Sequence, residues 1–145
     1  MKKSLIPTIF WILVGIFVVI VGAIVIPTPV FIRQILFPFM AIFSIIFFLL
    51  GIALVFLTLK QKVKGKLKRF LILTGASATG FFVGVILHNV FYAFGVLTSH
   101  LATLSRLMEI FHVAFFLIAT LVCPIAFLIG AVGSARLFIK KRKKK

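Results

Sequence analysis

Four long stretches without a charged residue constrain this chain more than any other feature. None of them contains Lys, Arg, Asp or Glu, and they cover residues 4–32, 34–59, 70–105 and 110–135. A helix needs about 20 apolar residues to cross the roughly 30 Å hydrocarbon core of a bilayer. Each stretch therefore holds one crossing, and none is long enough for two crossings joined by a turn. The sequence predicts four transmembrane helices.

The composition excludes several other classes of protein. Of the 145 residues, 63% are apolar, whereas a soluble domain usually has about 45–50%. Hydrophobicity this high excludes a disordered chain. The single acidic residue, Glu109, excludes an enzyme built on paired carboxylates. We interpret the chain as an all-α membrane protein with one transmembrane domain over residues 1–145, and we expect it not to be an enzyme.

Prolines and charged residues set the expected limits of the helices. Pro27 and Pro29 separate the first helix from the second, and Pro38 suits the first turn of the second helix. Pro124 lies in the middle of the fourth helix and is expected to kink or tilt it. The predicted helices cover residues 5–26, 38–59, 70–96 and 109–139. The stretches 30–37 and 98–108 are each expected to form a short helical turn, with Thr98 or Ser99 as N-cap in the second.

The distribution of basic residues predicts the orientation in the membrane. Fifteen of the 17 Lys and Arg residues precede the first helix, join the second to the third, or follow the fourth. Only Arg33 and Arg106 lie on the other side. Because short basic loops stay in the cytoplasm, we expect a four-helix bundle in the cell membrane with both termini cytoplasmic. The basic loop 60–69 and tail 140–145 are expected to contact anionic lipid headgroups. Neither tract contains the aromatic residues of a nucleic-acid surface.

The N-terminal segment and the cysteine content leave one alternative open. Lys2 and Lys3, an apolar stretch and then Gly22-Ala23 resemble a secretory signal, although the apolar stretch is longer than usual for one. Cleavage of residues 1–23 would leave the other three helices oriented as before. A single cysteine, Cys123, excludes a disulfide framework and a zinc site made of cysteine pairs.

Small residues on the last two predicted helices indicate how they pack. Gly80 and Gly84 lie on one face of the third helix, and Ala126 and Gly130 lie on one face of the fourth. Because small residues let helix backbones approach closely in lipid, we expect these two faces to meet. The first and second helices have fewer small residues and are expected to pack more loosely or to face more lipid.

Polar residues inside membrane helices are candidates for function. The candidate ligand site gathers near the outer surface and consists of His88, Asn89, Tyr92, Glu109 and His112. His88 is expected to face the fourth helix, and Asn89 to serve the first or second. Counted from the inner boundary, the two histidines differ by about 9 Å in height, too far to share a metal, so we expect no metal or cofactor. The simpler interpretation is local pairing, with Glu109 bonded to Arg106.

The sequence favours a structural or partner-binding membrane subunit. The alternative is a small oligomeric transporter or channel that uses the outer polar site, because four helices with so few polar residues enclose no aqueous path alone. Homo-oligomers or a membrane-protein partner fit either function. The directions of Ser44, Thr79, Asn89 and Thr120 distinguish them, since a shared polar stripe favours transport and scattered positions favour a structural role.

Overall fold

Four long apolar helices make up the molecule. The structure is a computed structural model that describes residues 5–27 and 29–142. The helices are α1 (Leu5–Val25), α2 (Val30–Lys60), α3 (Gly65–Leu97), α4 (Ala102–Leu117) and α5 (Cys123–Arg142), with a π-helical turn η1 (Ile118–Val122) between the last two. Because α4, η1 and α5 form one continuous rod, there are four helices long and apolar enough to cross a membrane. The prediction of four helices long and apolar enough for a crossing is confirmed.

Three helices begin earlier than the sequence indicates. The third begins at Gly65 rather than residue 70. The second begins at Val30 rather than residue 38, so Pro38 lies inside the helix and not in its first turn. The fourth begins at Ala102 rather than residue 109, and its N-cap is Leu101, not Thr98 or Ser99. In an apolar environment every backbone polar group needs an internal partner. Extending the helix over both flanking stretches provides those partners, at the cost of the single hydrogen bond that Pro38 cannot donate.

The turn between α2 and α3 is a Schellman motif. Val63 N donates to Thr58 O at 3.2 Å, and Lys62 N donates to Leu59 O at 3.0 Å, which satisfies carbonyls at the end of α2. Lys62 occupies the position that usually requires glycine, with a φ of 50°. Gly65, with a φ of 70°, then begins α3. The loop proper is therefore only residues 61–64, shorter than the predicted basic loop 60–69.

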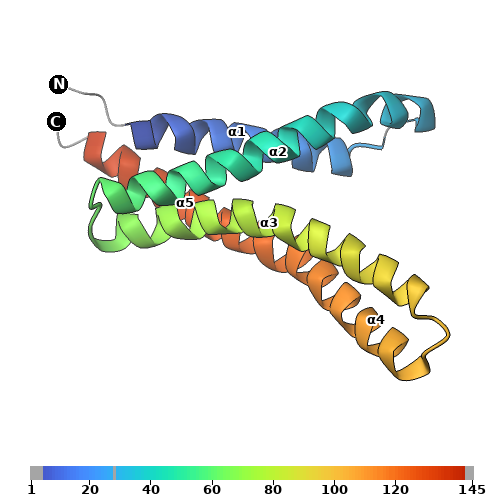
Figure 1. Cartoon of the computed structure of the whole chain (residues 1–145). Helices are drawn as coiled ribbons and strands as arrows, with labels where there is room; N and C mark the ends of the chain where they lie inside the picture. Colours follow the sequence, from blue (N-terminus) through green and yellow to red (C-terminus); the bar gives the residue numbers. More distant parts are fainter. Residues whose placement is uncertain (1–4, 28, 143–145) are drawn as a thin grey trace.

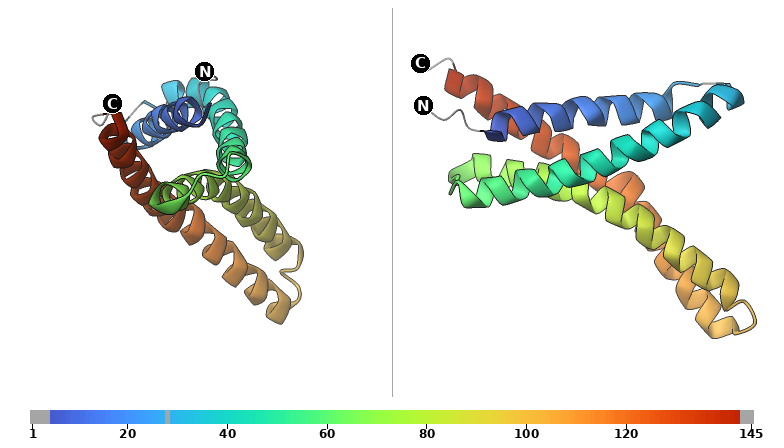
Figure 2. Two further views of the ribbon diagram at one scale, coloured as in Figure 1. Left: turned by 90° about the vertical axis from the view of Figure 1, so that its left-hand side faces the viewer. Right: turned by 45° about the horizontal axis from the view of Figure 1, so that its top comes forward.

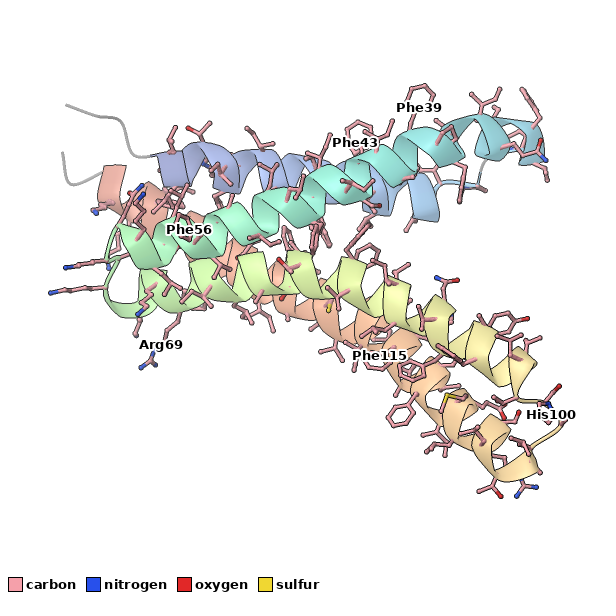
Figure 3. All side chains as sticks on the ribbon, viewed as in Figure 1. Phe39, Phe43, Phe56, Arg69, His100 and Phe115 are labelled. Atoms are coloured by element: carbon pink, nitrogen blue, oxygen red, sulfur yellow. The ribbon has the colours of Figure 1, made fainter. Side chains whose placement is uncertain are left out.

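The basic segments lie at one end of the molecule. Figure 1 shows the start of α1, the α2–α3 turn and the end of α5 together at the left. In Figure 3, Arg69 lies at this end and His100, in the α3–α4 turn, lies at the opposite end. We call the end at His100 the outer end of the molecule. The short, exposed loop thus shares a face with the C-terminal basic segment, as predicted. The parts of that prediction on Lys2, Lys3 and residues 143–145 lie outside the described residues.

Helix α3 is the centre of the packing, with α2 on one side and α5 on the other. Gly51 of α2 and Gly75 of α3 approach so closely that a Cβ on either would lie 2.7–2.8 Å from the carbonyl oxygen of the other. The second helix is therefore closely packed at this one point, because one glycine facing another suffices for close contact, while most of its length is exposed. By contrast, a Cβ added at Gly15 or Gly22 of α1 would have nothing within 4 Å.

A cluster of aromatic rings holds α1 and α2 against α5. Phe17 stacks on Phe127 with ring centroids 4.3 Å apart, and Phe47 lies 5.3 Å from Phe127. Phe47 and Phe127 are almost fully buried. Nearer the basic end, the buried Phe10 contacts Phe138 at 5.3 Å. These contacts belong to a core that lies in the basic half of the molecule and the middle.

Beyond the aromatic cluster the two hairpins separate. Figures 1 and 2 show α1 with α2 diverging from α3 with α4, so that the molecule has the shape of a V. Over the described residues, neither α1 nor α2 forms an extended contact with α4. In Figure 3, Phe39 on the outer part of α2 points away from the other hairpin. The bundle is therefore compact at the basic end only.

Candidate functional site

The seam between α3 and the fourth crossing consists mainly of small residues. A Cβ added at Gly80 would contact Cys123 Sγ at 3.2 Å, and one at Gly84 would contact Ala119 Cβ at 3.1 Å. Gly130 lies directly against Thr74 and the backbone of α3. Ala126 lies half-buried on α5, one turn from Gly130. The structure thus brings Gly80, Gly84 and Gly130 to the helix contact, and the partners of the first two are Cys123 and Ala119.

Two histidines stack against each other at the outer part of this seam. The ring centroids of His88 and His112 lie 4.1 Å apart with an interplanar angle of 25°. Each ring also bonds to the other residue's backbone: the Nδ1–O distance is 3.2 Å in both directions. Tyr92 and Phe116 flank the pair, each with its ring 5.3 Å from one of the histidines. The expectation that His88 faces the fourth helix and contacts one of the predicted residues is confirmed.

The reciprocal bonds define the chemistry of the histidine pair. A carbonyl oxygen only accepts hydrogen bonds, so Nδ1 of each ring must carry a proton and donate it. Each such bond stabilises the helix contact by about 1 kcal/mol. The pair therefore cross-links α3 to α4.

The expected difference in height between the two histidines is wrong. It rests on counting from Phe70 on one helix and from Arg136 on the other, as if these residues were level. In the structure the residue of α5 that lies against Phe70 is Gly133, not Arg136. Counting to His112 from Gly133 shortens the count by three residues, which reduces the expected height difference of about 9 Å by about 4.5 Å. The π-helical turn η1 also uses an additional residue within the fourth crossing. The ends of two different uncharged stretches are therefore a poor common reference for the depth of a residue.

A cavity of about 390 Å³ opens beside the histidine pair at the outer end of α3 and α4. We call it the outer cavity. Its polar lining comes from Tyr92, Ser99, Ser105, Glu109 and His112. Three of the five predicted site residues are therefore together, and His88 joins them through its stack on His112. Ser99 and Ser105 are lining residues that were not among the predicted site residues.

For Ser105, the spacing in the sequence does indicate a place in this site. Ser105, Glu109 and His112 are separated by four and three residues, which places them on one face of a helix. Interpreting 98–108 as a short turn leaves Ser105 off that helix. In the structure its hydroxyl reaches Gly95 O at 3.4 Å, across to α3. Ser99 lies in the α3–α4 turn, and no spacing in the sequence indicates its position.

Asn89 does not belong to the group, and Glu109 lacks its expected partner. The Asn89 side chain is exposed and donates to Val85 O of its own helix at 2.7 Å. The expectation that it serves α1 or α2 is wrong, because those helices have already diverged at that depth. Within the described ranges, the Glu109 carboxylate makes no ion pair with Arg106. In the same ranges, no three His, Cys, Asp or Glu side chains are grouped closely enough to hold a metal ion.

A second, apolar opening lies where the two hairpins separate. This crevice has a volume of about 290 Å³. Its walls come from both hairpins, and they include Phe17, Val21, Phe47, Phe81, Thr120 and Pro124. Pro124 lacks an N–H and its ring crowds the carbonyl four residues earlier, which accounts for the π-helical turn just before it. The fourth crossing changes its hydrogen-bond pattern at the level of the crevice.

Most hydroxyl and amide groups within the four long helices are satisfied locally, although the buried Ser134 hydroxyl has no partner within the described residues. In Ser44, Thr79, Asn89 and Thr120 the side chain donates to the carbonyl four residues earlier, at 2.7–2.9 Å. Buried Thr58, Thr74 and Ser77 do the same. Ser44, Thr79, Asn89 and Thr120 lie on three different helices, and of these four only Thr120 lines the crevice.

Comparisons with known protein families, curated proteins and solved structures find no match for this chain.

Proposed function

We propose that this protein is a non-enzymatic, partner-binding membrane subunit whose crevice receives a transmembrane helix of another protein. The observation that carries the proposal is the V shape, in which two hairpins join at one end and open an apolar crevice between them (Figure 2). The locally satisfied hydroxyl and amide groups support it, because a transport path would need polar groups directed to a common line. Lipid chains or a second copy of the chain are the competing occupants.

Photo-crosslinking in intact membranes tests the occupant. A photoreactive phenylalanine analogue replaces Phe81, which lines the crevice. The matched control carries the same analogue at Phe94, which is 52% exposed on the outer part of the same helix. The proposal expects an adduct with a different polypeptide from position 81 and not from position 94. Adducts with lipid alone, or with a differently tagged second copy, would overturn it.

The proposed orientation places both termini and the α2–α3 turn in the cytoplasm of a cell membrane. It is supported by the concentration of basic residues at one end of the molecule (Figure 3). The test uses Lys64→Cys and His100→Cys, one at each end, in a Cys123→Ala background. A membrane-impermeant maleimide added to intact cells should label the cysteine at position 100 only. Labelling at position 64 instead would reverse the orientation.

The outer cavity favours a second candidate function, a small oligomeric transporter or channel. The cavity combines the only acidic side chain of the sequence with Tyr92 and His112. This candidate predicts solute or ion flux in proteoliposomes that is lost in Glu109→Gln and retained in Asn89→Leu, since Asn89 lies outside the cavity. Equal flux in both variants, or flux no greater than in empty vesicles, would exclude it.

A further inference from the structure

Four lysines from two distant parts of the sequence line one cleft at the basic end. The cleft has a volume of about 330 Å³, and we call it the lysine cleft. Its lining residues are Lys64, Lys66, Leu67, Leu137, Lys140 and Lys141. The first three belong to the start of α3 and the last three to the end of α5. The fold, and not the sequence order, brings these charges together.

Nothing within the chain neutralises these four charges with an acidic side chain. The only acidic residue, Glu109, lies in the outer half of the molecule. Like charges in one cleft repel each other, and an anion from outside relieves that repulsion. The cleft therefore has the charge of an anion-binding site.

The start of α3 adds further donors to the cleft. Lys64 is the N-cap residue of α3, and its side chain makes no capping hydrogen bond. The first amides of a helix lack internal partners, and the helix dipole favours negative charge at this end. These amide groups add hydrogen-bond donors and positive potential to those of the lysines, on which the proposal rests.

The mixed lining of the cleft indicates an anion attached to an apolar chain. Leu67 and Leu137 line the cleft together with the lysines, and the apolar segments of α3 and α5 continue from this level. Basic clefts between membrane helices on the cytoplasmic side suit the headgroups of anionic lipids. Four ammonium groups exceed the single charge of one phosphodiester. We propose that the lysine cleft is a discrete site for an anionic phospholipid that carries two phosphates.

Native mass spectrometry of the full chain in detergent micelles measures this binding. Cardiolipin is the two-phosphate probe, and phosphatidylglycerol at equal phosphate concentration is the single-phosphate probe. The expected result is one tightly bound cardiolipin, with phosphatidylglycerol at least tenfold weaker. Inorganic pyrophosphate distinguishes a lipid from a soluble anion, and it should not displace cardiolipin at a hundredfold excess. Equal affinity for the two lipids, or displacement by pyrophosphate, would overturn the assignment.

A matched set of charge variants separates a discrete site from general basicity. One variant replaces Lys64, Lys66, Lys140 and Lys141 with Gln, and the control replaces Lys60, Lys62, Lys68 and Arg69 with Gln. Both lose four positive charges at the same end of the molecule. The first should bind cardiolipin at least tenfold more weakly and the control less than threefold. An equal loss of cardiolipin affinity in both quadruple variants would overturn the proposal, because it would show that binding depends only on net charge. The double variant Lys66→Gln with Lys140→Gln serves if the quadruple variant does not fold.

Discussion

Replacing Gly130 with alanine tests the seam between α3 and α5 at its tightest point. A methyl group there would lie 2.5 Å from Thr74 Oγ1, 2.8 Å from Thr74 N and 2.9 Å from Phe70 O. Two of these atoms belong to the backbone of α3. The third is held in place, because Thr74 Oγ1 donates to Phe70 O at 2.8 Å. The methyl group therefore fits only if the two helices move apart.

The expected loss of stability follows from three contributions. Overpacking costs about 1–3 kcal/mol, and disturbing the Thr74 hydrogen bond costs about 1 kcal/mol. Alanine in place of glycine gains up to about 1 kcal/mol in helix propensity. Together they predict a decrease of about 2 kcal/mol in the free energy of unfolding of Gly130→Ala. The control, Gly15→Ala on α1, has nothing within 4 Å of the added methyl group, so only the favourable contribution remains.

The single cysteine of the chain provides the assay. Cys123 is 7% exposed, so a fluorogenic maleimide reacts with it when the seam opens in heated detergent micelles. Gly130→Ala should lower the midpoint temperature of this reaction, while Gly15→Ala should leave it unchanged or raise it. Equal midpoints for the two variants would refute the argument that backbone contact at Gly130 limits the packing.

Four other substitutions address the α2–α3 turn, the histidine pair and two buried hydroxyls, with the same assay. Lys62→Gly should raise the free energy of unfolding by about 1 kcal/mol, because glycine adopts a positive φ without strain; no change would mean that the turn is not strained. His88→Phe should lower it by about 1 kcal/mol, since the ring contact with His112 remains and the Nδ1 donor is lost; wild-type stability would argue against that bond. Ser134→Ala should raise it by about 1 kcal/mol, because this buried hydroxyl has no partner within the described residues, whereas Thr58→Val should lower it through loss of the bond to Leu54 O.

The number of helices and part of the site were predictable from the sequence because both depend on local patterns. Uncharged stretches longer than a bilayer crossing fix the number of helices. The small residues around Gly84 and the position of His88 on the same face indicate that this face meets another helix. Such patterns hold whatever the rest of the chain does, and the structure places His88 against His112 accordingly.

Other features of the fold and the site depended on three-dimensional relations that no single stretch of the sequence contains. Whether Pro38 begins a helix or lies within one depends on the surroundings of residues 30–37, not on the proline. The tight contact of Gly51 with Gly75 required knowing that two isolated glycines face each other. The expected partner of Asn89 required four helices that stay together along their whole length, and the two hairpins diverge instead.

The V shape has a physical origin in where close contacts between the hairpins end. Gly51 and Gly75 join α2 to α3 in the middle of the membrane segments, and no glycine occurs in α2 between Val30 and Leu50. The outer part of α2 therefore offers only Ala41 and Ser44 as small residues for close backbone approach. The outer parts of α3 and α4 need no such contact, because Gly84 against Ala119 and Gly95 against Met108 already pair them. The hairpin of α3 and α4 is thus closely paired at the outer end without contacts from α2. The crevice follows from this distribution of small residues, which connects the proposed partner site directly to the sequence.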